Sequence, residues 1–468
     1  MFPDGRMELT WKLRPDVRWH DGAPLTADDF VFGVQVVQDP EVPLFRGLGI
    51  QGLSEVVALD DHTLMAKWKE PNFEANVTGP LDIGAFPRRL VGALYEGRDM
   101  QTFMNSPYWT TEFVGLGPFK LSQWLLGSYT EGVAFDAFFL GRPKIDRVVI
   151  RYIADLNTMV TNLLSGDIDL IPNIIKIEEI MAIRSAWDPR GGGSTVLNFS
   201  HVEALRIQFR YPNAPWARDV RVRKALVHMT DRQSLVDALL HGQTTVAHAF
   251  VSTQDPAYQL LDRRGFPRYP YDVTAGERLL ADAGWVGSPD GFVNASGERF
   301  TIELRVVANS AYNVNMGLAI TDQWKTARLN PTMFIVTNEL PTRQREELKA
   351  TPNGVFWQPD ALHSRILDVF TLRQSSTEQS LWRGTNYGAF SNPAYDAMYE
   401  RYVSTLQASA RQEQHADLLK FLAEEVPFIP TLYGPNNSMA FRAGLRGPTP
   451  LRPEQLVSTW NIYAWEMS

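Results

Sequence analysis

Few groups of side chains in this 468-residue sequence have the spacing of a known reaction centre. The motifs GxxxxGK[ST], HExxH and GxSxG, which bind phosphate, bind zinc or carry a serine nucleophile, do not occur. Residues 47–52 (GLGIQG) fit the formula GxGxxG, but no clear strand precedes them and a strand is predicted to follow. We interpret them as a glycine-rich turn rather than a dinucleotide site, and residues 191–194 (GGGS) as a mobile loop.

The titratable residues form no obvious cluster. His241 and His248 have no carboxylate at a ligand spacing, which indicates structural or surface histidines. Acid pairs such as Asp28 and Asp29 fall at predicted helix ends, although the sequence leaves open a glycosidase with two carboxyl groups about 5 Å apart. Cysteine is absent, which excludes disulfides, thiolate metal sites and cysteine nucleophiles. We therefore expect no catalytic residue, no metal site and no cofactor.

Aromatic residues are the unusual feature of the composition, with 13 Trp, 15 Tyr and 25 Phe. Four of them fall in predicted loops, where core packing is not the default: Trp109, Trp357, Trp382 and Tyr387. Aromatic side chains in loops favour a closed ligand pocket. Packing in the core is the alternative for each of them.

Length and charge narrow the class of protein. At roughly 150 residues per domain the chain has room for about three domains, and 44% hydrophobic residues are typical of a globular protein. A net charge of −8 without a basic block argues against a nucleic-acid partner. No run of about 20 apolar residues predicts a membrane-spanning helix. Met1 is followed at once by Phe-Pro-Asp-Gly, so we expect either a cytosolic protein or a true N-terminus further upstream.

Strands and helices are predicted to alternate along the chain, which indicates an α/β or α+β protein with several lobes. Strands are predicted at 8–13, 53–59, 63–68, 119–124, 148–153, 168–171, 300–307, 333–336 and 428–432. Helices are predicted after Thr26 and Asp155, over 220–229, from Asp231 to Gly242, from Thr274 to Gly284, over 321–327, after Asn392 and over 410–425. Thr26 with Asp29, and Thr274 with Glu277, fit capping boxes. Residues 148–171 predict a strand–helix–strand unit.

Six stretches resemble, in the correct order, the family 5 extracellular solute-binding proteins of ABC importers. They are LTWKLRPDVRWHDG with PLTADD (9–29), GLGPFKL (115–121), LGRPKIDRV (140–148), LSGDIDL (164–170), DVRVRKALVHMTDRQSLV (219–236), and 386–397 with 423–432. The resemblance covers nearly the whole chain.

The resemblance implies a two-lobed periplasmic-binding-protein fold with an extra small domain and a ligand cleft between the lobes. Residues 1–112 would form the small domain, 113–203 plus 441–468 lobe I, and 204–440 lobe II. Family members have a signal sequence and the first strands of lobe I ahead of this opening. We therefore expect an N-terminally truncated chain with an unpaired sheet edge, from a periplasmic or extracellular, membrane-associated protein.

The implied function is that of the substrate-binding component of an ABC importer, which is not an enzyme. It would capture an oligopeptide, or a peptide-like, opine or chelate ligand, by a Venus-flytrap hinge motion. Its partner would be a permease in the inner membrane, and we expect a monomer. A hydrolase acting on a peptide- or sugar-like ligand and a ligand-sensing receptor of the same fold are the alternatives.

Residues 357–365 (WQPDALHSR) resemble the stretch W-x-x-D-Y-x-D-P, in which peptide-binding members carry an acid for the peptide amino terminus. Asp360 matches the first acid, while the usual DP is replaced near Arg365. The resemblance implies an apolar wall at Trp357, an anionic anchor at Asp360 and a cationic anchor at Arg365. The other predicted ligand contacts are His363, Trp382, Tyr387, Arg343 and Trp109. The alternative is that Asp360 and Arg365 pair with each other at the surface.

Overall fold

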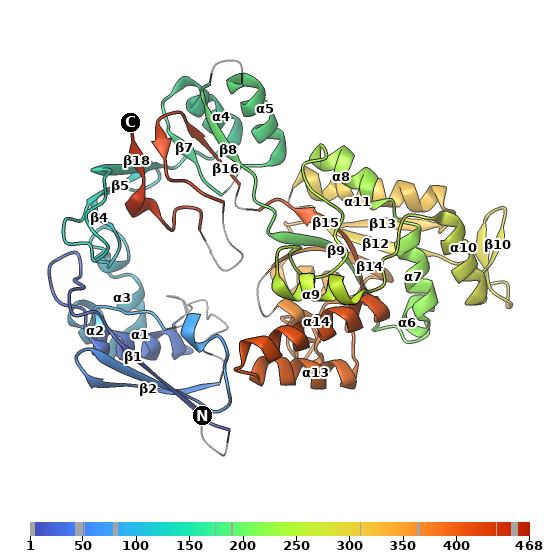
Figure 1. Ribbon diagram of the computed structural model, residues 1–468, viewed down its shortest axis with the longest axis horizontal. Coiled ribbons are helices and arrows are strands. Elements are labelled where there is room, and N and C mark those ends of the chain that lie inside the picture. The colour runs from blue at the N-terminus through green and yellow to red at the C-terminus, as the bar shows by residue number, and fades with distance from the viewer. Residues whose placement is uncertain are drawn as a thin grey trace. The chain divides into compact units, whose positions relative to one another are not determined.

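The computed structural model describes residues 5–42, 50, 52–77, 83–173, 175–188, 191–308, 310–362, 366–436, 438–450 and 457–468. The chain forms two compact units. Figure 1 follows their elements along the chain. The predicted turn at 47–52 falls almost wholly outside the described residues.

Unit 1 takes its residues from both ends of the chain, as Met1–Val196, Val403–Leu406 and Asn437–Ser468. Its strands are β1 (Met7–Lys12), β2 (Leu53–Asp60), β3 (Thr63–Trp68), β4 (Phe119–Leu125), β5 (Tyr129–Ala134), β6 (Arg147–Arg151), β7 (Leu170–Ile171), β8 (Gly193–Val196), β16 (Met439–Arg442), β17 (Leu445–Arg446) and β18 (Glu466–Met467). Its α-helices are α1 (Ala27–Gln38), α2 (Arg88–Glu96), α3 (Met100–Met104), α4 (Leu156–Ser165) and α5 (Ile177–Trp187).

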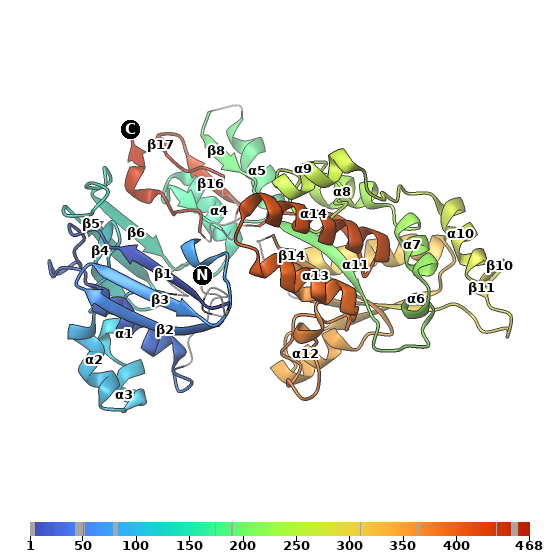
Figure 2. The ribbon, with the colours of Figure 1, turned by 60° about the horizontal axis from the view of Figure 1, so that its bottom comes forward.

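The first sheet of unit 1 has the order β1-β3-β2 and is antiparallel, which confirms the predicted hairpin of β2 and β3. Figure 2 shows the three strands side by side. Leu9, Trp11 and Leu13, in and just after β1, all pack against one apolar cluster, as their alternation predicts. Helix α1 packs on this sheet and adds Ala27 and Val34 to the cluster.

Another sheet of unit 1 contains a strand from near the end of the chain, which lies between two earlier strands. Its order is β7-β16-β8, and β16 is antiparallel to both neighbours. The strand–helix–strand prediction for residues 148–171 is therefore wrong in one respect, because β6 lies in the separate sheet β4-β5-β6. The missing neighbour of β7 comes from a part of the sequence that local periodicity cannot reveal.

Glycines 191–193 do not simply form a mobile loop, because Gly193 begins strand β8. A Cβ atom on Gly193 would lie 2.3 Å from the carbonyl oxygen of Phe441 and 2.7 Å from the ring of Trp187. The glycine thus allows the backbone to pass beneath the indole and pair with β16. The prediction of a mobile loop missed this packing role.

Unit 2 contains Leu197–Tyr402 and Gln407–Asn436. Its strands are β9 (His201–Ile207), β10 (Val286–Ser288), β11 (Gly291–Val293), β12 (Ile302–Val307), β13 (Pro331–Val336), β14 (Gly354–Ala361) and β15 (Phe428–Gly434). Its α-helices are α6 (Pro215–Arg218), α7 (Val220–His228), α8 (Arg232–Leu240), α9 (Pro256–Arg264), α10 (Val273–Asp282), α11 (Ala311–Thr326), α12 (Thr342–Ala350), α13 (Pro393–Ser404) and α14 (Ala408–Glu425).

A five-stranded mixed sheet of order β13-β12-β14-β9-β15 organises unit 2. Strand β12 is parallel to β13 and β14, whereas β9 is antiparallel to β14 and β15. Helix α11 contacts β12 and β13, and α7 and α8 contact β15. The core includes fully buried Trp216, Trp324 and Tyr395.

Helix starts were predicted with mixed success. The side chain of Asp231 caps α8, and Asn392 accepts hydrogen bonds from the first turn of α13, as expected. Helix α10 is capped by Asp272 and not by Thr274, because the aspartate two residues earlier already bonds the Ala275 amide. Helix α11 begins at Ala311, ten residues before the predicted start, since its buried residues extend through the earlier turns. In the part of the chain that the structure describes, no helix has the length and apolarity needed to cross a membrane.

The predicted capping box of α1 is present and is also the polar centre of its surroundings. The Asp29 carboxylate is 7% exposed and accepts hydrogen bonds from the Thr26 amide (3.1 Å), the Trp19 indole (3.1 Å) and the Arg88 amide (3.3 Å). One side chain thus joins the start of α1 to the start of α2.

Replacing Asp29 with alanine should lower the free energy of unfolding of unit 1 by about 1–3 kcal/mol, because the buried Trp19 N–H loses its acceptor. Denaturation in urea, followed by tryptophan fluorescence, measures the change. Asp28→Ala is the matched control, since Asp28 makes only an exposed pair with Arg88 at 3.2 Å. Equal shifts for the two variants would contradict this account.

Candidate functional site

A cavity of about 300 Å³ lies at one edge of the unit 2 sheet. Strands β12 and β13 end there, at Val307 and Val336, and α11 begins there at Ala311. Ligands of open α/β sheets bind at the carboxyl ends of parallel strands, so this edge is the first place to expect a site. The lining residues are Val307, Asn313, Asn338, Arg345, Glu346, Lys349, Phe356, Trp357, Gln358 and Pro359.

The first turn of α11 is fixed to the end of β12. Ser310 caps the helix and accepts a hydrogen bond from the Asn313 amide at 3.2 Å. The Asn313 side-chain amide in turn donates to the carbonyl oxygen of Val307 at 3.2 Å. These bonds hold a helix N-terminus, which attracts negative charge, beside the cavity.

A group of charged residues on α12 forms one wall of the cavity. The Glu346 carboxylate accepts from Lys349 Nζ at 2.8 Å and from the Tyr387 hydroxyl at 2.9 Å, and lies 4.0 Å from Arg345. Lys349 Nζ also lies 5.2 Å from the centre of the Tyr387 ring. Burial, followed by the nearby Glu346 charge, raises the pKa of Tyr387, so its hydroxyl keeps its proton. Two cations against one carboxylate leave this wall positive.

Trp357 supplies an apolar wall with an unused donor. Its side chain is 1% exposed and makes an edge contact with Tyr312 at a centroid distance of 6.3 Å. The indole Nε1 is buried and has no hydrogen-bond partner within the described residues. A buried N–H without an acceptor is costly, so this donor is available to a bound oxygen.

Asp360, three residues further along β14, is buried and paired. Its Oδ2 accepts from Arg206 Nη2 of β9 at 2.7 Å, and the two residues are 9% and 4% exposed. The Arg206 guanidinium lies 4.6 Å and 4.4 Å from the rings of Phe250 and Phe370. Burial raises the pKa of Asp360 while the Arg206 charge opposes the shift. Asp360 is therefore not at the surface, as the alternative of a surface pair with Arg365 requires, and its described partner is Arg206.

The structure brings together some of the predicted contacts. Trp357 lines the cavity, Asp360 lies on the same strand, and Tyr387 bonds to a lining residue. Arg343 is exposed on α12. The Arg210 guanidinium lies 5.3 Å from the centre of the Trp382 ring, and the backbone φ of Trp382 is 63°. His363 and Arg365 lie outside the described residues.

Trp109 lies in unit 1, in an aromatic cluster. It makes edge contacts with Phe86, Phe103 and Tyr108, and its indole donates to the Phe103 carbonyl at 2.6 Å. The structure thus gives this side chain the core packing that was its alternative interpretation.

Sequence analysis missed Glu203 and Arg206, which lie inside the buried strand β9 with 2% and 4% exposure. The signal was present, because the strand HVEALRI carries two charged residues among apolar ones. It also missed Glu346 and Lys349, which look like ordinary surface charges of a helix.

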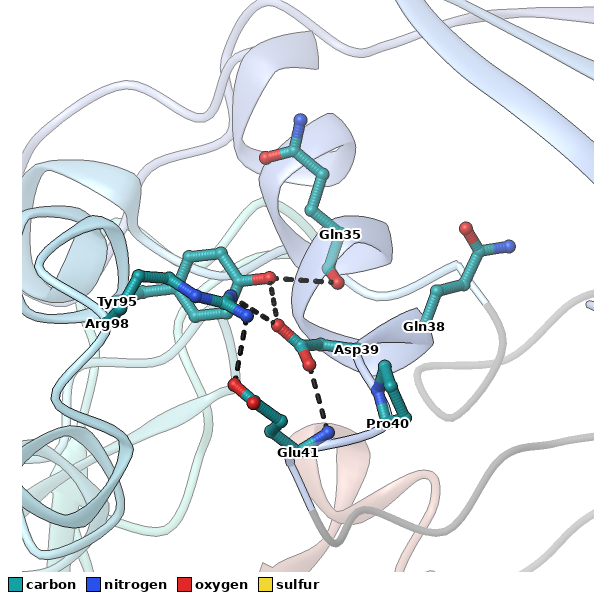
Figure 3. Close-up of a pocket in the computed structure, with 7 residues that line it drawn as sticks. All are labelled: Gln35, Gln38, Asp39, Pro40, Glu41, Tyr95 and Arg98. Atoms are coloured by element: carbon teal, nitrogen blue, oxygen red, sulfur yellow. Dashed lines mark hydrogen bonds and ion pairs between the residues drawn. The ribbon is translucent and has the colours of Figure 1, made fainter.

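A second hollow, of about 410 Å³, lies in unit 1 (Figure 3). The buried Asp39 carboxylate accepts from Arg98 Nη1 at 2.7 Å, the Tyr95 hydroxyl at 2.8 Å and the Glu41 amide at 2.9 Å. These bonds, the Glu41 amide first, lower the pKa of Asp39 to about 2. Arg98 also pairs with Glu41 at 2.9 Å. Because these charges satisfy one another, the hollow is a weaker candidate for a ligand than the cavity of unit 2.

Residues 3–360 match the family of bacterial extracellular solute-binding proteins, family 5 Middle. The chain belongs to this family. An oligopeptide-binding protein, AppA of Bacillus subtilis, is 25% identical over 459 residues, which cover 95% of this chain and 78% of that protein. The family consists of solute-binding proteins, and this chain is the substrate-binding component of an ABC importer. Members act in the periplasm or outside the cell.

Solved structures share the fold over the whole chain. NikZ from Campylobacter jejuni, in complex with Ni(L-His), aligns with a TM-score of 0.75 at 21% identity and covers 100% of this chain and 89% of that one. AppA from Bacillus subtilis, in complex with a nonapeptide, aligns with a TM-score of 0.71 at 21% identity and covers 100% and 88%. The predicted α/β periplasmic-binding-protein fold is thereby confirmed.

Arg206→Met should destabilise unit 2 by about 3–5 kcal/mol, because it leaves Asp360 buried without a counter-charge. Adding Asp360→Asn to Arg206→Met should recover much of the loss, and the double-mutant cycle of unfolding free energies measures this coupling. Arg299→Met removes an exposed pair with Asp290 at 3.1 Å and should cost less than about 1 kcal/mol. Additive effects of the two core substitutions would show that the pair is not coupled.

Glu203 should make the stability of unit 2 depend on pH. Burial, followed by the Asp360 charge, raises the pKa of its carboxyl from 4.5 to about 8. An acid with a raised pKa favours folding fully below its unfolded pKa, and the benefit is lost as the pH rises through the folded value. Relative to Glu203→Gln, the wild type should therefore lose at least about 1 kcal/mol between pH 4.5 and pH 8 in denaturant titrations. Parallel pH profiles for the two proteins would contradict the shift.

Proposed function

We propose that the unit 2 cavity binds the solute that this importer component captures, and that the solute is an oligopeptide or a peptide-like, opine or chelate ligand. The observation that carries the proposal is the positive wall of Arg345 and Lys349 at the carboxyl edge of the sheet, in a cavity also lined by Trp357, whose indole N–H has no acceptor among the described residues. Such a site suits a ligand with a carboxylate and further oxygen acceptors.

The roles of the other residues follow from their surroundings. Trp357 packs flat apolar parts of the ligand, and Lys349 anchors its negative charge. Asp360 acts mainly as the partner of Arg206, since a ligand ammonium group would have to compete with a guanidinium at 2.7 Å. Further contacts are proposed for Tyr387, His363, Arg365, Trp382 and Arg343, whereas Trp109 packs in the core of unit 1.

The proposal extends to properties of the whole protein. The chain acts as a monomer that passes its solute to a permease of the inner membrane, without catalysis and without a nucleic-acid partner. It works in the periplasm or on the outer surface of the cell in association with the membrane. A hydrolase would convert its ligand, so recovery of unchanged ligand after long incubation distinguishes binding from turnover.

Isothermal titration calorimetry with a nonapeptide, a pentapeptide and nickel–histidine tests the site. One of these probes should bind, and Lys349→Ala should weaken its binding at least tenfold, because truncating one partner of a desolvated charge pair costs about 2–5 kcal/mol. Arg365→Ala should do the same and leave the melting temperature nearly unchanged. Lys325→Ala, an exposed lysine at the end of α11, is the matched control and should bind normally. Unchanged affinity for Lys349→Ala, Arg365→Ala and Trp357→Phe alike would exclude this cavity as the site.

A further inference from the structure

Glu203 is a buried acid that the proposed solute site does not use. It is 2% exposed, and its neighbours Val202 and Ala204 on β9 are fully buried. Its Oε2 atom is buried and has no hydrogen-bond partner within the part of the chain that the structure describes. An ionised carboxylate in such a place is strongly disfavoured, whereas a neutral carboxyl is tolerated.

The Glu203 carboxyl lies directly against the last residue of β15. A Cβ atom on Gly434 would lie 2.0 Å from Glu203 Oε1, so a larger residue there would force the Glu203 side chain to move. The Thr431 hydroxyl donates to the Glu203 carbonyl oxygen at 2.8 Å, which fixes the backbone of β9 against β15. The Glu203 carboxyl is therefore in contact with the end of β15, and the backbone of Glu203 is bonded to the same strand.

The titratable groups near Glu203 do not supply a counter-charge. Asp360 of β14 acts on it with the same sign, while Arg206 donates to Asp360 through Nη2 and keeps Nε and Nη1 without a partner in the described residues. Burial lowers the pKa of His201, two residues earlier on β9, to about 4, and raises the pKa of Tyr433 of β15. Both are therefore uncharged at neutral pH. Removal of the Glu203 proton would place a second negative charge beside Asp360.

Both contact partners lie close to points where the chain passes between the two units. One crossing is at Val196–Leu197, shortly before Glu203, and another is at Asn436–Asn437, shortly after Gly434. The two crossing segments are joined by a hydrogen bond from the Asn436 amide to the Asn198 carbonyl at 2.8 Å. A change in the packing of Glu203 on Gly434 is thus transmitted to both segments within a few residues.

We propose that Glu203 is a proton-dependent latch on the two crossing segments. With its proton, the carboxyl packs on Gly434 and holds the start of β9 and the end of β15 together. Without it, the carboxylate turns toward water, Gly434 loses this contact, and the crossing segments open more often. Conformational change between the units of this importer component is therefore regulated by pH, whichever solute it binds.

Hydrogen–deuterium exchange of the full chain at pH 6 and pH 9, corrected for the intrinsic exchange rates, tests the latch. In the wild type, protection of residues 197–203 and 430–436 should fall at least tenfold at pH 9, while α7 (220–228) stays unchanged. Glu203→Gln, which cannot ionise, should keep its protection at both pH values. Glu378→Gln removes an exposed carboxylate of the same unit and should behave like the wild type.

Two results would overturn the latch: equal protection of the wild type at both pH values, or the same loss in Glu203→Gln. Gly434→Ala gives an independent reading, because its methyl group displaces the carboxyl. It should show weak protection of both segments already at pH 6, and full protection would also overturn the proposal. Should Glu203→Gln not fold, Glu203→Met, which is neutral and of similar length, replaces it with the same expected result.

Discussion

Compensation of charge inside the five-stranded sheet is the constraint on which unit 2 depends. Strand β9 lies between β14 and β15 and carries both Arg206 and Glu203 in a setting that is otherwise apolar. The guanidinium meets this constraint by pairing with Asp360 and lying against two aromatic rings. The same pair fixes β9 relative to β14, and β14 continues directly into the wall of the candidate cavity. Positioning of Trp357 is therefore linked to the neutralisation of Arg206.

The candidate site combines a floor with a charged wall from α12 and an apolar wall from β14. The ends of parallel strands and a capped helix N-terminus form the floor, and α12 adds cations that a single carboxylate only partly balances. Glu346 holds Lys349 and Tyr387 in place before a ligand arrives, which reduces the entropy lost on binding. A ligand carboxylate would take over part of the role of Glu346. Glu346 therefore both holds Lys349 and Tyr387 in place before binding and competes with the ligand for them.

The sequence predicted most elements but fewer of the contacts between them. Capping residues such as Asp29 and Asp231 could be read locally because a helix start needs an acceptor within three residues. The place of β16 between β7 and β8 could not be predicted from the local sequence, because it joins residues far apart in the chain. Trp357, as an aromatic residue, and Asp360, through the family resemblance, were predicted as ligand contacts, whereas Arg206 lies on another strand and only the sheet register brings it to Asp360. Glu346 and Lys349 have the pattern of any solvated helix, and only their neighbours distinguish them.

The strand order β7-β16-β8 also determines when each part of the molecule can fold. Strands β7 and β8 leave the ribosome long before β16, so they lack the strand between them until almost the whole chain has been synthesised. Nearly all of unit 2 is one continuous segment, which lies in the sequence between β8 and β16. Loop closure across so many residues is slow, and the corresponding closure in unit 2, which pairs β9 with β15, needs only residues that are synthesised before β16. Unit 2 therefore folds as an insertion within an unfinished unit 1, whose sheet β7-β16-β8 forms only once β16 has been synthesised.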